Sequence, residues 1–496
     1  MKISVLCENT AIPPYKSEHG LSLYIETSQH KLLFDCGQSD LFIENAKLAG
    51  VDLTKVDTLI LSHGHYDHCG GVLAFHQMNP QAKIYIHQNA GDDYYHIENE
   101  LHKYIGINKN ILNLPNINIC HGNLKIDDEL ELIQQISHHH PLLNNHKVLK
   151  RRVNDAYEND SFEHEMVLMI HDDINCLCGG CAHNGILNII ESINQPIDMV
   201  ISGFHLKQKS YSDEDIDYIK NLGNALKKQD ALFYSGHCTG PFAYDLLKQI
   251  MKDQLQELHT GKIMNTTSEI MLYKVKKQVV ELLEHDNSGH GMNHIERVLK
   301  LALRFAKEES VDKDLVALIA LLHDVDDYKL LGHEQAEKLI NAKTFMKNAN
   351  VPEEIQDKVL NALQKFGYSK SLKGNRPDTI EGKIVSDADM CDALGVNGVL
   401  RTFQYSLKNG MPFFDKNIYP IEQLTAEQYT KKVASSSVCH FFEKILKLKN
   451  MMMTESGKKE AISRHQIIVE MLYHLFDEED APEWKEYLTD YLAKQK

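Results

Sequence analysis

At 496 residues, the chain is too long for one ordinary hydrophobic core, and we expect two or three domains. Its 43% hydrophobic and 25% charged residues are typical of a soluble globular protein, and its net charge of −17 argues against a basic nucleic-acid-binding surface and against an anionic membrane as partner. The sequence has no apolar run of about 18 residues and no charged-then-apolar signal at its N-terminus, so we expect a cytoplasmic protein.

The first half of the chain alternates predicted strands with predicted helices. Residues 1–37 alternate apolar and polar side chains as strands do, and residues 39–49 are predicted to form a helix. Residues 88–160 are polar and poorly periodic, so we expect long loops with small secondary-structure elements that cover an active site. Further strands are predicted at residues 56–61, 82–87, 165–177, 198–203, 231–236 and 270–275, and a helix begins at residue 186.

Four potential metal ligands follow the strand predicted at residues 56–61. The segment LSHGHYDHCGG contains His63, His65, Asp67 and His68. A strand that ends in a glycine-containing turn can direct all four side chains into one cavity, and their nitrogen and oxygen atoms suit zinc, and also iron or manganese. His63 and His65 are placed to hold one ion, with Asp67 and His68 placed for a second. The alternative is a histidine-rich surface turn that binds nothing.

This segment resembles the signature of the metallo-β-lactamase superfamily, and four other segments support the resemblance. They are KLLFDCG with the inward-facing Asp35, CGGCAHNGILN (178–188), SGFHL (202–206) and YSGHCTG (234–240). The resemblance covers about residues 1–274 and is greatest for the dihydropterin-ribofuranosylaminobenzene-phosphate synthase-like subgroup. It implies a four-layer αβ/βα sandwich.

The resemblance also implies a dinuclear site that hydrolyses its substrate with metal-bound hydroxide, because a divalent ion lowers the pKa of bound water toward neutrality. His63, His65 and His183 would hold one ion, and Asp67, His68 and His237 the other. Where many relatives have a bridging aspartate, this chain has Cys181, a softer ligand that favours zinc. Asp67 is also a candidate catalytic residue. His205 would contact the substrate or carry a proton, the alternative being a structural buried histidine.

Ten cysteines in a large chain of this kind are expected to be free thiols or ligands. Cys176, Cys178 and Cys181 form a C-x-C-x-x-C cluster, but a separate zinc knuckle there would need a fourth ligand, and none is obvious nearby. We therefore expect Cys176 and Cys178 to lie along a strand, with Cys181 approaching the metal site beside His183.

From about residue 276, the sequence pattern is almost entirely helical. Three segments, HGMNHIERV (290–298), ALIALLHDVDDYK (317–329) and IVSDADMCDALG (384–395), supply in order a histidine, a His-Asp pair and an aspartate. Such a set can hold one or two divalent ions between helices, and a buried hydrogen-bonded His-Asp pair is the alternative. The predicted ligands are His294, His323, Asp324 and Asp389.

These segments resemble the HD phosphohydrolase superfamily over roughly residues 285–480, and residues 440–479 resemble the tail of a bacterial subgroup, some members of which cleave nucleoside triphosphates. The resemblance implies one divalent ion, such as manganese or magnesium, that presents water to a phosphoester or phosphoanhydride. Asp324 would then also be a catalytic residue. Lys329, one helical turn beyond the His-Asp pair, would meet a phosphate, or would be a solvated lysine.

The chain departs from this second family in one respect. Many relatives have a His-Ser pair before the last aspartate segment, whereas this chain has Phe366-Gly367-Tyr368-Ser369, which favours a single ion. Alignment to the family's ADxL pattern favours Asp389 as the ligand and leaves Asp387 as a residue that supports the ligands.

We therefore predict an α/β domain at residues 1–274, an all-α HD domain at 275–496 and a short connection near 274–284. The predicted function is a two-domain metal-dependent hydrolase of small phosphorylated molecules that binds neither nucleic acid polymers nor membranes. Two alternatives remain open. The first domain could be a pterin-ribofuranosylaminobenzene-phosphate synthase-type enzyme, or one domain could be a nucleotide-binding sensor for the other.

Overall fold

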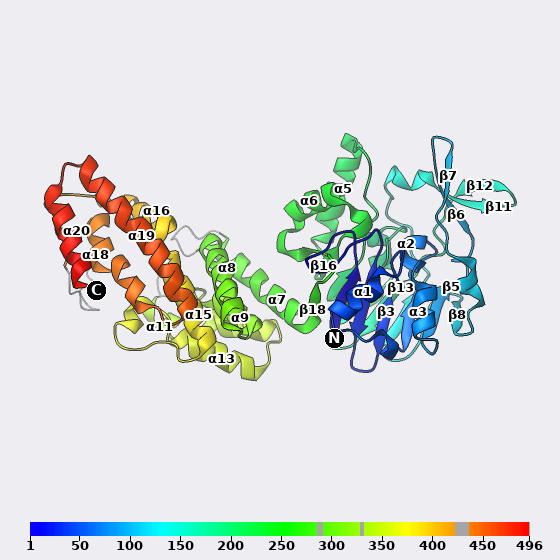
Figure 1. The fold of residues 1–496 in the computed structure, drawn as a ribbon, viewed down its shortest axis with the longest axis horizontal. Coiled ribbons are helices and arrows are strands. Elements are labelled where there is room, and N and C mark those ends of the chain that lie inside the picture. The colour runs from blue at the N-terminus through cyan, green and yellow to red at the C-terminus, as the bar shows by residue number, and fades with distance from the viewer. Residues whose placement is uncertain (285–290, 328–331, 422–435, 496) are drawn as a thin grey trace. The chain divides into compact units, whose positions relative to one another are not determined.

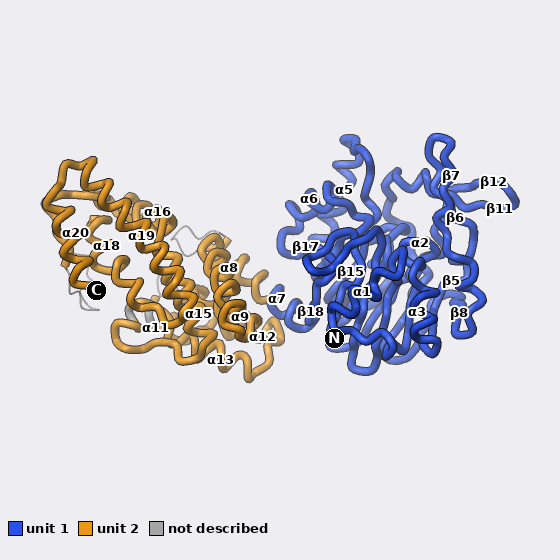
Figure 2. The backbone as a smooth tube through the Cα atoms, in the orientation of Figure 1, with its two compact units in different colours: residues 1–273 blue, residues 274–496 orange. Residues whose placement is uncertain are grey.

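The structure is a computed structural model, and it describes residues 1–284, 291–327, 332–421 and 436–495. The chain divides into two compact units, Met1–Tyr273 and Lys274–Lys496 (Figure 2). Helix α7 (Thr266–Leu283) contains the boundary between them.

Two seven-stranded sheets form the interior of the first unit (Figure 1). The first sheet has the order β18-β1-β2-β3-β4-β5-β8, and the second has the order β17-β16-β15-β14-β13-β10-β9. The strands of the first are β1 (Lys2–Cys7), β2 (Ser22–Glu26), β3 (Lys31–Phe34), β4 (Thr58–Ile60), β5 (Lys83–His87), β8 (Ile117–Cys120) and β18 (Ile263–Asn265). Those of the second are β9 (Leu124–Lys125), β10 (Leu130–Ile133), β13 (Val167–His171), β14 (Asn175–Cys178), β15 (Met199–Ile201), β16 (Leu232–Ser235) and β17 (Leu255–Glu257).

The two sheets pack face to face, and helices cover their outer faces. Alternate side chains of both sheets, such as Phe34 and Ile201, form the central apolar core. The opposite faces pack against helices that bury one apolar side each, which confirms the predicted αβ/βα sandwich. The helices of this unit are α1 (Leu41–Leu48), α2 (Tyr66–Cys69), α3 (Val72–Met78), α4 (Ile186–Glu191), α5 (Asp213–Leu226) and α6 (Pro241–Met251). The 3₁₀ turns are η1 (Leu53–Lys55), η2 (Lys109–Asn113), η3 (Asn144–Val148), η4 (His237–Thr239) and η5 (Lys252–Gln254).

Parallel strands dominate one half of each sheet. β3, β4, β5 and β8 are parallel neighbours, as are β14, β15, β16 and β17. The carboxyl ends of neighbouring parallel strands lie at the same edge of a sheet, so the loops that follow them are brought together. The segments with the predicted ligands follow β4, β14, β15 and β16.

Residues 88–160 are more ordered than predicted. They include a four-stranded antiparallel sheet in the order β12-β11-β6-β7, formed by β6 (Asp93–Glu98), β7 (Leu101–Tyr104), β11 (Leu149–Val153) and β12 (Ala156–Asn159). β7 and β12 are exposed along their whole length, so they bury no apolar face that would give the sequence a period of two. The small cluster Tyr94, Ile105, Leu149 and Phe162 holds the base of this insertion together.

The strand predicted at residues 270–275 is wrong, because these residues lie within helix α7. Met271, Val275, Val279 and Leu283 are all buried and follow one another at intervals of four residues. That spacing places them on one face of a helix, and the helix continues well beyond the six residues that were read as a strand.

Among the described residues, the second unit is helical, as predicted. Helices α8, α9 and α15 pack against one another at its centre, and α9 is buried from Leu315 to its end at Leu322. Its helices are α8 (Met292–Glu309), α9 (Lys313–Leu322), α11 (His333–Ala336), α12 (Ile340–Asn348), α13 (Glu353–Gln364), α14 (Tyr368–Ser371), α15 (Ile380–Asp392), α16 (Gly395–Lys408), α18 (Ser437–Glu443), η6 (Ile445–Met451), α19 (Glu455–Glu478) and α20 (Pro482–Lys494). Every helix in the described part of the chain is too short or too polar to cross a membrane.

Candidate metal centres

The four ligands predicted after the strand at 56–61 lie at the carboxyl end of β4, in the turn that enters α2. All four are buried: His63, His65, Asp67 and His68. This turn passes close to a neighbouring segment, because a Cβ atom at Gly64 would lie 2.4 Å from the carbonyl oxygen of Ala90. Glycine at this position therefore lets the turn pack tightly enough to direct the flanking side chains inward.

Three strand ends contribute the first group of converging ligand atoms. His68 follows β4, Cys181 follows β14 and His237 follows β16. His68 Nε2 lies 3.2 Å from His237 Nε2 and 3.3 Å from Cys181 Sγ. Asp67 Oδ2 lies 3.4 Å from His237 Nε2, so the structure brings together the three ligands predicted for one ion, with Cys181 beside them.

The protonation of this group follows from its hydrogen bonds. His68 Nδ1 lies 2.6 Å from Asp35 Oδ2, and His237 Nδ1 lies 3.0 Å from Asn9 Oδ1. The Asn9 oxygen also accepts from the Gly20 N–H, which fixes the orientation of the amide. Because each Nδ1 faces an oxygen acceptor, each carries the proton, and the two Nε2 lone pairs face each other at 3.2 Å.

Two facing lone pairs repel unless a cation lies between them. Without a metal ion, a proton can take that place: although burial opposes it, the carboxylates of Asp35 and Asp67 raise the pKa of His68 to about 9. A divalent ion satisfies both nitrogens and the nearby Asp67 carboxylate at once. These three side chains are therefore better suited to binding a metal ion than to binding one another directly.

The second group consists of His63, His65 and His183, whose ring centroids lie 4.6–4.9 Å apart. His63 Nδ1 lies 2.9 Å from Ser62 Oγ, which in turn donates to Asp35 Oδ2 at 2.7 Å. His63 Nε2, His65 Nε2 and both ring nitrogens of His183 are buried without a hydrogen-bond partner among the described residues. Burial also holds the pKa of His63 and of His183 well below the usual value, so these imidazoles are neutral and can act as ligands.

His205 lies beside the second group, at a position that its sequence context predicted. It follows β15, has a left-handed φ of 48°, and places its ring 4.2 Å from that of His183 between centroids. Its carbonyl oxygen accepts from Asn145 in the insertion at 2.7 Å, and its Nδ1 is buried without a partner in the described chain. This side chain is neutral, because burial holds its pKa well below the usual range.

Three further histidines, none of them predicted from the sequence, lie near these groups: His146, whose ring lies 4.7 Å from that of His205, and two others. His19, from the loop between β1 and β2, lies 3.2 Å from Asp67 Oδ2 through its Nε2 and stacks on the His237 ring at 4.8 Å. His164 packs its ring 5.1 Å from that of His65. None of the three lies in a recognisable ligand spacing, so only the fold reveals them. Cys176 and Cys178 lie on β14, as predicted.

In the second unit, the four predicted ligands converge from α8, the end of α9 and α15. His294 Nε2 lies 3.2 Å from His323 Nε2, 3.3 Å from Asp324 Oδ2 and 3.4 Å from Asp389 Oδ1. His323 Nε2 lies 3.6 Å from Asp324 Oδ2. Two imidazole nitrogens and two carboxylate oxygens therefore surround one point, which suits one divalent ion.

The same proton arrangement as in the first unit recurs here. His323 Nδ1 lies 2.7 Å from the Ala320 carbonyl oxygen, and His294 Nδ1 lies 2.7 Å from Asp392 Oδ2. Both Nδ1 atoms therefore donate, and again two Nε2 lone pairs face each other. Although burial opposes it, Asp324, Asp389 and Asp392 raise the pKa of His294 well above its usual value, so a proton competes with the ion for this place.

Asp392, which was not among the predicted ligands, is held by two arginines. Arg297 donates to both of its carboxylate oxygens at 2.7 and 2.9 Å, and Arg401 donates to one at 2.7 Å. Although burial raises it, Arg297 and His294 bring the pKa of Asp392 well below the usual range. Asp392 is therefore a fixed anion that orients His294.

Asp387 binds the backbone directly before α19, where residues 453 and 454 lie. Its carboxylate accepts from the backbone N–H groups of Met453 and Thr454 at 2.7–3.0 Å. Lys329 lies outside the described residues. A different lysine, Lys444, lies with its Nζ 4.9 Å from the centre of the Tyr368 ring. Burial lowers its pKa to about 8, although the Asp389 charge opposes this.

Comparison with known proteins assigns a family to each unit. The model of the metallo-beta-lactamase superfamily matches residues 17–141, and that of the HD domain matches residues 291–394. The chain is 31% identical over 274 residues to the uncharacterized protein MJ0448 of Methanocaldococcus jannaschii, covering 53% of this chain and 98% of that protein. It is 30% identical over 212 residues to the uncharacterized protein YpgQ of Bacillus subtilis, covering 42% and 93%.

A third relative has a named activity. The chain is 29% identical over 292 residues to the 7,8-dihydropterin-6-methyl-4-(beta-D-ribofuranosyl)-aminobenzene-5'-phosphate synthase of M. jannaschii, covering 53% of this chain and 96% of that enzyme. Among solved structures, Tm1679, a metal-dependent hydrolase of the beta-lactamase superfamily, is 28% identical, with 53% and 98% coverage and a TM-score of 0.46. B. subtilis YpgQ in complex with ADP is 26% identical, with 43% and 96% coverage and a TM-score of 0.34.

Replacing Asp35 by asparagine is expected to weaken zinc binding in the first unit by roughly 10- to 100-fold. His68 would lose its carboxylate acceptor, and Ser62, which orients His63, would lose its carboxylate acceptor as well. Zinc titration of the metal-free protein against a chromophoric chelator measures this. Asp57→Asn is the matched control, since the Asp57 carboxylate is hydrogen-bonded to His30 and to the Lys31 N–H, neither of which is a predicted ligand. Equal affinities of Asp35→Asn and wild type would show that Asp35 does not orient the ligands.

Asp392→Asn is expected to weaken manganese binding in the second unit by at least roughly tenfold, because the anion that orients His294 is lost. Electron paramagnetic resonance of free manganese gives the affinity. Asp378→Asn removes an exposed carboxylate that pairs with Lys365 and should leave the affinity unchanged. The same loss in both variants would contradict a specific role for Asp392.

Proposed function

The chain belongs to the metallo-beta-lactamase superfamily through its first unit and to the HD-domain family through its second, and on this premise we propose that it is a two-site metallohydrolase of small phosphorylated molecules. The observation that carries the proposal is the same in both units. Pairs of buried histidines have their Nδ1 protons committed to oxygen acceptors and their Nε2 atoms 3.2 Å apart, with carboxylates beside them.

In the first unit, we propose two ions, zinc by preference, because the soft Cys181 sulfur adjoins the nitrogen ligands. His63, His65 and His183 would hold one ion, and Asp67, His68 and His237 the other. Ions at these places would supply hydroxide near neutral pH and polarise a phosphoryl or carbonyl oxygen. Asp35 accepts from His68 Nδ1, which leaves Nε2 as the atom that faces the ion.

The residues around the first site have distinct proposed roles. Although burial opposes it, His68 and His19 help to hold the pKa of Asp67 well below its usual value, so Asp67 is an anion that can accept a hydrogen bond from the attacking water. His205 is neutral and presents a buried Nδ1 without a partner in the described chain, which suits a hydrogen bond to the substrate or a proton transfer. His19 is partly exposed and lies 3.2 Å from Asp67 Oδ2 through its Nε2, which supports a role in contacting the substrate.

A pterin-ribofuranosylaminobenzene-phosphate synthase-type activity is the second candidate for the first unit. The 29% identity to the M. jannaschii synthase, over nearly the whole of that enzyme, favours it. The two candidates share the metal site and differ in the substrate that the insertion would admit.

In the second unit, we propose one divalent ion, such as manganese or magnesium, held by His294, His323, Asp324 and Asp389. It would neutralise phosphate oxygens during hydrolysis of a phosphoester or phosphoanhydride. Asp324 is the proposed acceptor for the attacking water, and Lys444, a cation on which the Asp389 charge acts, is the proposed contact for a substrate phosphate. The proposed substrate class is nucleotide-like, the class of ligand with which the relative YpgQ was crystallised.

Metal analysis combined with activity screening tests both halves of this proposal. The wild type should contain about three ions per chain, the double variant His63→Ala/His65→Ala about one, and Asp324→Ala about two. Metal content is measured by inductively coupled plasma mass spectrometry on the purified full chain. Each protein is screened against nucleotides and other phosphoesters.

Nucleotide cleavage should disappear in His323→Ala and Asp324→Ala and persist in His65→Ala, because each variant removes ligands from one site only. Circular dichroism confirms that the variants are folded. Lys370→Ala serves as a control in the second unit, since Lys370 is not among the ligands. Loss of nucleotide cleavage in His65→Ala without unfolding would contradict independent sites, and full metal content without any phosphoester cleavage would favour the synthase.

A further inference from the structure

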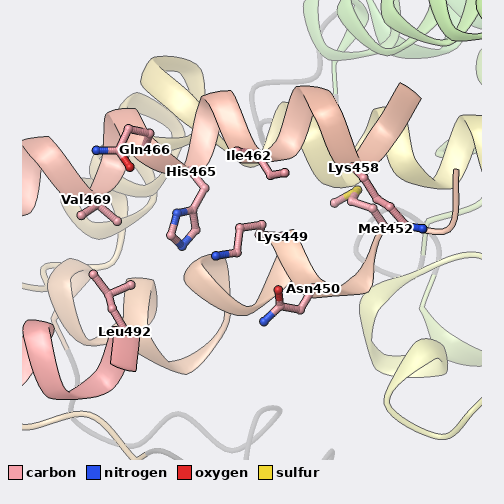
Figure 3. A pocket seen from close by; sticks show the side chains of 9 residues that line it. All are labelled: Lys449, Asn450, Met452, Lys458, Ile462, His465, Gln466, Val469 and Leu492. Carbon is pink, nitrogen blue, oxygen red and sulfur yellow. The ribbon is translucent and has the colours of Figure 1, made fainter. Parts of the chain in front are cut away.

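The second unit contains a pocket of about 650 Å³ that shares no residue with the metal cluster. Its volume is within the range of roughly 300–1,000 Å³ that small-molecule sites occupy. The lining side chains come from η6, α19 and α20, and Figure 3 shows Lys449 and His465 facing each other at its centre. Nothing in the proposed hydrolase function uses this pocket.

The polar side chains of the pocket are basic or neutral. Lys449 and Lys458 line it, and no carboxylate does. Lys458 pairs with Glu455 at 2.7 Å, whereas no carboxylate of the described chain forms an ion pair with Lys449. In a chain of net charge −17, a lysine-lined pocket without an acidic side chain is a local attraction for anions.

His465 provides the second, independent observation. It is 5% exposed, and its Nε2 is buried without a hydrogen-bond partner among the described residues. Burial and the adjacent Lys449 charge lower the pKa of His465 to about 4, so the ring is neutral at neutral pH. A buried imidazole nitrogen without a partner costs free energy, which a ligand in the pocket can recover.

The remaining lining is largely apolar. Figure 3 shows Val469 and Leu492 on one side of the Lys449–His465 pair and Ile462 and Met452 on the other. Ile462 is 60% exposed, an unusual fraction for a large aliphatic side chain in a concave site. An apolar group in the pocket would remove it from water.

We propose that this pocket binds a small amphiphilic anion, whose phosphate or carboxylate group meets Lys449 and His465 and whose apolar part covers Ile462 and Val469. A bare inorganic anion would leave the apolar lining in water. A neutral hydrocarbon would bury the Lys449 ammonium group without a counter-charge, which is costly. Only a ligand that combines both features satisfies the whole lining.

Calorimetric titration of the full chain with four probes tests this proposal. Octyl phosphate and octanoate carry the two anionic groups, 1-octanol lacks the charge, and inorganic phosphate lacks the apolar part. At least one of the two amphiphilic anions should bind at least tenfold more tightly than 1-octanol and inorganic phosphate. Preference for octyl phosphate would identify a phosphorylated ligand, and preference for octanoate a carboxylated one; either result supports the site.

Variants locate the binding. Lys449→Gln should weaken the binding about tenfold. Lys459 is an exposed lysine on α19 that does not line the pocket, so Lys459→Gln should leave the binding unchanged. Ile462→Asp, a change at an exposed position that folding tolerates, should weaken it as well by repelling the anion. His323→Ala should bind as wild type does.

Three outcomes would overturn the proposal. One is equal binding by the Lys449 and Lys459 variants. Another is binding of 1-octanol as tight as that of the anions. The third is loss of octyl phosphate binding in His323→Ala, which would place the ligand at the metal cluster. The last result would leave the hydrolase proposal intact, and a failed nucleotide screen would leave this pocket intact.

Discussion

The Asp35 carboxylate is the constraint on which the first metal centre depends. One oxygen of this buried side chain accepts from His68 Nδ1 and from Ser62 Oγ, and the serine in turn orients His63. A single carboxylate at the carboxyl end of β3 therefore orients one predicted ligand in each of the two groups. The sandwich keeps it in place, because the backbone N–H of Ser62 also donates to Asp35 at 2.7 Å. Buried charge is tolerated here because every oxygen has a donor.

The second unit reaches the same result with an unrelated architecture. Asp392, fixed between Arg297 and Arg401, holds His294 as Asp35 holds His68. In the sandwich, ligands come from loops at the ends of parallel strands, whereas in the helical unit they come from three packed helices. The shared requirement is chemical: an imidazole that binds an ion through Nε2 must carry its ring proton on Nδ1 and be correctly oriented. Each fold supplies an oxygen acceptor behind the ring for this purpose.

That the candidate ligands converge could be predicted from the sequence, because both families carry them in short segments in a fixed order. His63 to His68 lie within one turn, and His323 and Asp324 are adjacent, so spacing alone was informative. Asn9, His19 and Asp392 could not be found in this way, since their importance depends on contacts between distant segments. The insertion was predicted as loops, because its exposed strands bury no apolar face. The strand predicted at residues 270–275 failed because a stretch of six residues shows too little of a helical period.

The hydrogen bonds of Asp387 mean that the helical metal centre is larger than the segment that matches the HD domain. That match ends at residue 394, yet Asp387, two residues before the predicted ligand Asp389 on α15, accepts hydrogen bonds from the N–H groups of Met453 and Thr454. Without them, a buried carboxylate would lose its donors, and the helix that carries Asp389 would lose an anchor. Ser456, just beyond, also binds Glu309 at the end of α8. A fragment that ends at residue 394 would contain every predicted ligand but would lack these hydrogen-bond donors. We therefore expect the smallest fragment of this unit that folds on its own to include α19.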